Sequence, residues 1–207
     1  EVKNTGGLAV QYGWRDVGDS MLGGWGGVSP EDVRIPSFYN DTHVGATNFS
    51  AQYLRTKDVR WFELGQIATR HFMDIDVSHA NRKWYRYPKG FGPGEIHASG
   101  HESVDHHGRN GHPSHAHVSG LPEYYWLTGD KRALEVLVEM GSWWANAVPV
   151  MFPTPIANPH YAEAERDFGW PLYVLNRVTD VTGDLKYHRA AAQLTKHMIQ
   201  WWQQLKE

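Results

Sequence analysis

The sequence predicts an all-α fold, namely an incomplete or partial (α/α) toroid of about three helical hairpins with long loops. A turn pattern recurs at Tyr53–Asp58, Trp126–Asp130 and Asp180–Asp184. In each copy, Gly or Lys is suited to end one helix and Asp to cap the next. The copies are irregularly spaced, which disfavours a short-period solenoid and favours a toroid with elaborated loops.

Amphipathic stripes after the three turns predict the second helix of each hairpin, because apolar residues recur there at three- and four-residue spacing. The stripes are Trp61, Leu64, Ala68, His71, Phe72 and Ile75; Leu134, Leu137, Val138, Gly141, Trp144 and Ala145; and Tyr187, Ala190, Ala191, Leu194, Met198, Trp201 and Trp202. The first helices are expected at roughly 43–55, 115–127 and 164–181. They carry small residues and would form an inner layer.

Long irregular stretches separate the hairpins, at roughly 77–114 and 148–163, and such loops are usually functional. We expect a loop-rich entry segment at 1–38 and a toroid lobe at 39–207. The sequence predicts no pairs of strands, although it is compatible with short strands within 1–38 or 82–98. The chain begins without Met or a leader, so we expect it to come from the interior of a longer polypeptide.

Composition excludes several classes of protein. The 207 residues contain no Cys, which excludes a disulfide scaffold, a zinc ribbon and a thiol nucleophile. The net charge of -3 gives no basic field for nucleic acid, and no apolar run is long enough to predict a membrane partner. Ten Trp and thirteen His remain as the unusual features.

Histidines gather in one loop, since seven of the thirteen lie between His97 and His117. We expect isolated residues such as His71, His188 and His197 to be structural. Polar residues also recur at fixed distances from the Thr of each hairpin turn. The position thirteen residues before that Thr is His43 in the first hairpin, His115 in the second and Gly169 in the third. The position sixteen residues before it is Asn40, His112 and Arg166, respectively. These positions lie at or before the starts of the expected inner helices, where helix N–H groups favour an anionic ligand.

Three loops would then face one mouth of the toroid. They are Phe38–His43, His106–His112 and Asn158–Arg166. Together they offer imidazoles, phenols, amides, guanidinium groups and carboxylates. This set suits proton abstraction beside a carboxylate: Asn or Arg neutralises the carboxylate, His or Tyr takes the proton, and Tyr or His protonates the leaving oxygen.

Three other interpretations stay open. Glycoside hydrolysis needs two carboxyl groups, for which Asp41, Asp105, Glu163 and Glu165 are available. The cofactor is unknown, and a divalent metal ion would be held from a loop by His97, His101, Asp105 and His106. The chain could also be a non-catalytic glycan-binding lobe.

Several segments resemble a known family. Tyr39–Gly45, Gln52–Leu64 and Arg70–His79, with Gly13–Asp19 and His115–Leu121 similar in style, resemble the α/α-toroid domain of exo-rhamnogalacturonan lyase-like proteins. In that family the toroid follows a β-barrel and a β-sandwich, and uronate-containing polysaccharides are cleaved by β-elimination. The resemblance implies a secreted or periplasmic enzyme, a polysaccharide or oligosaccharide substrate, and β-rich partner domains of the same parent protein. This chain lacks those β domains and is richer in histidine.

The register and the resemblance together nominate the site residues. The catalytic candidates are His43, His107 and His115, one of which would be the base, and Tyr161, the acid. Substrate contacts are expected from Tyr39, Asn40, Arg109, His112, His160 and Arg166, with Asn40 and Arg109 or Arg166 holding the uronate carboxylate. No metal ligand is among them.

Overall fold

Helices make up most of the part of the chain that the structure describes, as the sequence predicts. The computed structural model describes residues 2–3, 10–11, 20–22, 37–39, 45–80, 90–96, 117–118, 120–155 and 165–204. Within these ranges the elements are α1 (Gly45–Thr56), α2 (Val59–His71), a π-helical turn η2 (Phe72–Asp76), α3 (Leu121–Thr128), α4 (Lys131–Met151), α5 (Arg166–Thr182) and α6 (Leu185–Gln204). The prediction of an all-α fold is therefore confirmed.

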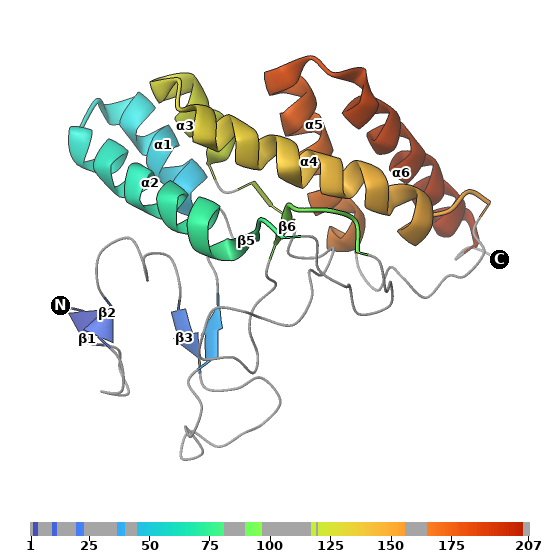
Figure 1. The fold of residues 1–207 in the computed structure, drawn as a ribbon, viewed down its shortest axis with the longest axis horizontal. Helices are drawn as coiled ribbons and strands as arrows, with labels where there is room; N and C mark the ends of the chain where they lie inside the picture. Colours follow the sequence, from blue (N-terminus) through green and yellow to red (C-terminus); the bar gives the residue numbers. More distant parts are fainter. Residues whose placement is uncertain are drawn as a thin grey trace.

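The six α-helices pair into three consecutive hairpins, α1–α2, α3–α4 and α5–α6. Helices α1, α3 and α5 contact one another in sequence order, while α4 packs against α6. All three hairpin turns lie at the top of Figure 1, and the inner helices α1, α3 and α5 begin at the opposite end. The described part of the chain is thus a layered row of hairpins.

Short antiparallel strand pairs accompany the helices. They are β1 (Val2–Lys3) with β2 (Val10–Gln11), β3 (Ser20–Leu22) with β4 (Ser37–Tyr39), and β5 (Val77–Ser78) with β6 (Glu95–Ile96). The last pair begins before the range in which the sequence allowed strands. It lies close to α4, because a Cβ at Gly94 (φ +104°) would be 2.3 Å from the backbone of Glu139.

The three hairpin turns share one set of hydrogen bonds. Thr56, Thr128 and Thr182 each donate their hydroxyl to the carbonyl four residues earlier, at 2.6–2.7 Å, and accept from the backbone N–H of the following Asp at 3.1–3.2 Å. Asp58, Asp130 and Asp184 then accept from the N–H two residues later, at 2.9–3.0 Å. Each Asp therefore caps the second helix of its hairpin, as predicted.

The residue between Thr and Asp adopts a left-handed conformation in every turn. Lys57 has φ 60°, Gly129 φ 71° and Gly183 φ 70°. Each of these residues donates its backbone N–H to the carbonyl four residues earlier at 2.7 Å. Glycine adopts this conformation without steric cost, whereas lysine has a Cβ atom that makes it unfavourable. The first turn therefore carries backbone strain that its two counterparts avoid.

We predict that Lys57→Gly raises the free energy of unfolding by about 1 kcal/mol, because it removes a left-handed non-glycine residue. Gly129→Ala and Gly183→Ala should lower it by a similar amount, since nothing lies within 4 Å of either added Cβ and only the backbone is affected. Urea unfolding of the three variants tests this. A Lys57→Gly variant less stable than the parent would contradict it.

Two helix boundaries differ from the prediction. The inner helix α3 begins at Leu121 and not near residue 115. Gly120, at φ +79°, precedes it, and a Cβ there would be 2.8 Å from the backbone of Ala46 in α1. Because the chain passes so close to α1 at this point, residue 120 has to be a glycine in the left-handed conformation. The sequence predicts helix at this position. In contrast, α4 continues through Pro149 to Met151, beyond the predicted loop start at 148.

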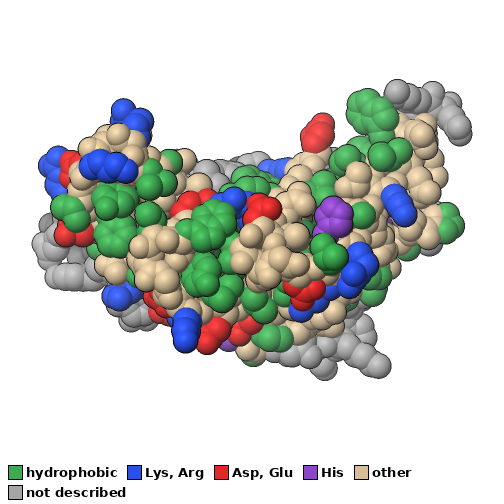
Figure 2. All heavy atoms as spheres, turned by 90° about the horizontal axis from the view of Figure 1, so that it is seen from above, with side chains coloured by type: hydrophobic (Ala, Val, Ile, Leu, Met, Phe, Trp, Pro, Cys, Tyr) green, Lys and Arg blue, Asp and Glu red, His purple; other side chains and the backbone are tan. Residues whose placement is uncertain are grey.

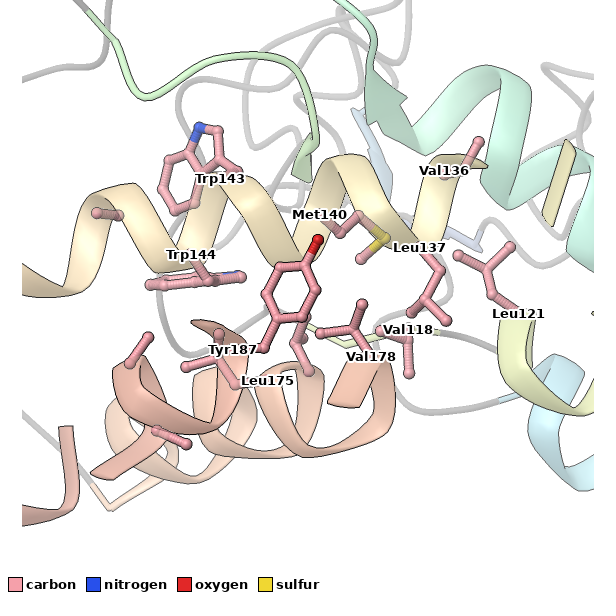
Figure 3. Close-up of a cluster of buried hydrophobic side chains, with 14 of the residues drawn as sticks. Val118, Leu121, Val136, Leu137, Met140, Trp143, Trp144, Leu175, Val178 and Tyr187 are labelled. Atoms are coloured by element: carbon pink, nitrogen blue, oxygen red, sulfur yellow. The ribbon is translucent and has the colours of Figure 1, made fainter. Parts of the chain in front are cut away.

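The core lies between the helices of the last two hairpins. Its fully buried side chains include Leu121 from α3, Leu137 and Met140 from α4, and Leu175 and Tyr187 from α5 and α6. Figure 3 shows Tyr187 and Val178 reaching toward α4. Gly141 permits this approach, because a Cβ there would be 2.6 Å from Val178 Cγ1.

The predicted stripes are largely buried, with two exceptions. Leu64 is 41% exposed, because the buried face of α2 is centred on Gly65, Ala68 and Thr69. Trp202 is 56% exposed, since it lies beyond the last buried residues of α6. Figure 2 shows hydrophobic side chains among the charged ones on the face seen from the turn end. Among the described helices, none has the length and apolar character needed to cross a bilayer.

Candidate functional site

The end of the hairpin row opposite the turns is the place where the sequence puts the site. The inner helices begin there with Gly45, Leu121 and Arg166, and the outer helices α2 and α4 end there. The starts of α1 and α3 lie in direct contact at Ala46 and Gly120. Helix N-termini at one end provide a field that favours an anion.

Most of the predicted site residues lie outside the described residues. These are His43, His107, His115, Tyr161, Asn40, Arg109, His112 and His160, together with the carboxyl candidates Asp41, Asp105 and Glu163. Tyr39 belongs to β4, and its backbone pairs with Ser20. Arg166 is the first residue of α5 and is exposed. Glu165, also exposed, is the residue before it.

A buried histidine and a buried aspartate lie next to each other at the end of α2. His71 Nε2 lies 3.6 Å from Asp76 Oδ1, and both side chains are almost fully buried. His71 is the last residue of α2, and Asp76 is the last residue of the π-helical turn η2, which carries the chain from α2 into β5. His71 is thus a structural histidine, as the sequence suggested. His188 differs from that expectation, because it is exposed.

Replacing Asp76 with Ala should lower the free energy of unfolding by about 3 kcal/mol, because it removes the carboxyl group next to a buried imidazole. Asp74→Ala is the matched control, since Asp74 belongs to the same π-helical turn and is exposed. Denaturant unfolding measures both variants. Equal effects from the two substitutions would argue against a stabilising role for the His71–Asp76 pair.

His117 and Asp167 are also buried at this end. The His117 ring lies 5.3 Å from the Phe72 ring and 6.0 Å from the Trp170 ring, measured between centroids. Asp167 is buried in the first turn of α5, where a carboxylate interacts favourably with the helix dipole. His117 therefore connects the end of α2 to the start of α5.

His197 of α6 is the third buried histidine among the described residues. Its Nδ1 donates to the carbonyl of Pro153 at 2.6 Å, which leaves Nε2 as the unprotonated nitrogen of the neutral ring. The ring packs against Phe152 and Phe168. Burial lowers the pKa of His197 below its ordinary value of 6.5, against the opposing effect of the hydrogen bond to Pro153.

This lowered pKa predicts a loss of stability in acid. Below about pH 6.5 the unfolded chain binds a proton at His197 that the folded protein resists, so stability falls as the pH decreases. The melting temperature of His197→Gln should therefore decline less between pH 7.5 and 5.5 than that of the parent. His188→Gln, at an exposed position of the same helix, should decline as the parent does. Identical profiles for all three proteins would contradict the assignment.

A second group of polar and aromatic side chains lies on the inner helices. We call Glu123, Trp126, Tyr173 and Arg177 the inner-face cluster. Arg177 forms an ion pair with Glu123, and its guanidinium carbon lies 4.8 Å from the centroid of the Trp126 ring. Trp126 is nevertheless 52% exposed. Burial raises the pKa of the Tyr173 phenol, and the negative charge of Glu123 adds to this effect, while Arg177 opposes it.

Sequence reasoning missed this cluster, although its signal was present. Arg166, Trp170, Tyr173 and Arg177 recur at four- and three-residue spacing, which puts them on one face of α5. The buried residues Phe168, Pro171, Val174, Leu175 and Val178 occupy the other face. The outer helices are marked by stripes of apolar residues, whereas this stripe on α5 is polar and aromatic.

The described residues contain no group of three or more His, Asp or Glu side chains placed to hold a metal ion. The chain matches no known protein family, and neither a curated protein nor a solved structure is significantly similar to it.

Proposed function

We propose that this chain is the α/α-toroid lobe of a polysaccharide lyase that cleaves a uronic-acid-containing glycan by β-elimination. The observation that supports this best is the position of Arg166. It is an exposed cation on the first residue of α5, at the end where all three inner helices begin. A guanidinium beside helix N-termini is suited to hold a carboxylate.

In the proposed mechanism, Arg166 or Arg109, with Asn40, binds the uronate carboxylate and spreads its charge. This lowers the pKa of the proton on the neighbouring sugar carbon C5. One of His43, His107 or His115 takes that proton as general base. Tyr161 then donates a proton to the departing oxygen, the C4–O bond breaks, and a C4–C5 double bond remains in the product.

The buried side chains at the same end would serve as support. His71 with Asp76 holds the end of α2, and His117 packs between α2 and α5. Side chains that are locked by packing keep neighbouring groups in position for reaction. In the proposal, the rest of the toroid, β-rich domains of the same parent protein and a secreted or periplasmic location complete the enzyme.

The test is incubation with polygalacturonate and with rhamnogalacturonan, followed by ultraviolet detection of an unsaturated uronate. Loss of the true base by substitution of His43, His107 or His115 with Ala should reduce the rate by about 100-fold or more. Arg166→Ala should raise KM by about tenfold, since it removes one charge-assisted contact. Arg189→Ala, which removes an exposed arginine from α6, is the control and should change neither value.

Cleavage without an unsaturated product would contradict the lyase proposal and favour hydrolysis by Asp41 with Glu163 or Glu165. Binding of these polymers without any cleavage, unchanged by the His→Ala substitutions, would instead favour a non-catalytic glycan-binding lobe.

A further inference from the structure

Two members of the inner-face cluster, Tyr173 and Arg177, lie on the same face of α5 as Arg166. Along α5, Arg166, Trp170, Tyr173 and Arg177 follow one another at helical spacing. From Arg166 to Arg177 the helix rises by about 16 Å, at 1.5 Å per residue. Trp170 and Tyr173 are in edge contact, with ring centroids 5.9 Å apart. A continuous strip of aromatic and polar groups therefore extends from the start of α5 toward the hairpin turn.

Trp126 lies at the far end of this strip and has an exposed ring. It comes from α3, three residues after Glu123, so both residues face α5 from the same side of their helix. An exposed tryptophan next to hydrogen-bonding groups is suited to stack against the apolar face of a sugar ring. The stacking surface is also held in place, because the Arg177 guanidinium lies over the ring at 4.8 Å and is itself paired with Glu123.

The charges around Trp126 favour an uncharged sugar. Arg177 is the cation, and it is shared between Glu123 and Asp180, whose Oδ2 lies 3.8 Å from Arg177 Nη1. Two carboxylates against one guanidinium leave an excess of negative charge. A uronate carboxylate would be repelled here, while sugar hydroxyls can donate to the carboxylate of Asp180, whose side chain is 58% exposed.

We propose that Trp126, together with Arg177, Glu123 and Asp180, forms a subsite for a neutral sugar ring of the glycan chain. This inference rests on the glycan-directed function proposed above. A chain bound along the face of α5 would place a uronate at Arg166 and a neutral sugar at Trp126.

The experiment is affinity electrophoresis in gels that contain a neutral β-galactan. This polymer has no uronate and so cannot undergo β-elimination, which separates binding from activity. Trp126→Ala should weaken retardation of the protein by at least about tenfold in dissociation constant, equivalent to the loss of one stacked ring. Trp126→Phe should retain part of the binding. Trp202→Ala, which removes a tryptophan of similar exposure from α6, is the matched control and should bind as the parent does.

Polygalacturonate supplies the second arm, because every sugar in it is acidic. Its binding should change less than about twofold in Trp126→Ala. The proposal is overturned if the parent is not retarded by galactan, if both Trp→Ala variants lose binding equally, or if Trp126→Ala weakens polygalacturonate binding as much as galactan binding. The two proposals can also be separated. If galactan binding depends on Trp126 but uronate polymers give no unsaturated product, the proposed subsite is supported and the proposed lyase activity is contradicted.

Discussion

The left-handed residue between Thr and Asp in each hairpin turn is the constraint on which the arrangement depends. It reverses the chain within a few residues, while the Thr hydroxyl and the Asp carboxylate satisfy the helix ends that the reversal exposes. Because the three turns share this geometry, all inner helices run in the same direction and begin at the same end. That common end gathers His71, Asp76, His117 and Asp167 in the interior and leaves Arg166 at the surface. The packing of the three hairpins therefore brings these ionisable side chains to one end of the row.

The inner helices have two faces with different roles. On α5, residues such as Val174, Leu175 and Val178 are fully buried against the core, which forces Trp170, Tyr173 and Arg177 to the opposite face. There Arg177 contacts Glu123 and Trp126 of α3, so the polar face also joins two hairpins. Arg177 therefore links two neighbouring helices and also supports an exposed aromatic ring, which is the ring of the proposed sugar subsite. Within the cluster, the Arg177 and Glu123 side chains are 20% and 17% exposed, whereas Trp126 is 52% exposed.

The helical class and the three turns could be predicted from the sequence because their signals are local. A Thr-Gly-Asp or Thr-Lys-Asp tripeptide between apolar stretches specifies its own hydrogen bonds. The start of α3 could not be predicted in this way, since Gly120 is left-handed in response to Ala46, a contact between distant parts of the chain. The buried and clustered side chains of the candidate site could not be predicted for the same reason. The contact of His71 with Asp76 and the contact of Arg177 with Trp126 depend on tertiary packing, whereas the histidine cluster can be recognised from composition alone. The catalytic assignment of His43, His107, His115 and Tyr161 remains a prediction.

The central claim is that one face of α5 is the track along which a glycan binds. A crystal structure of the protein with an oligosaccharide of alternating neutral and uronate residues tests this most directly. The account predicts a uronate carboxylate within hydrogen-bonding distance of Arg166 and a neutral ring stacked on Trp126, with the sugars between them passing Trp170 and Tyr173. An oligosaccharide bound to the outer helices, or with a uronate placed at Trp126, would contradict it.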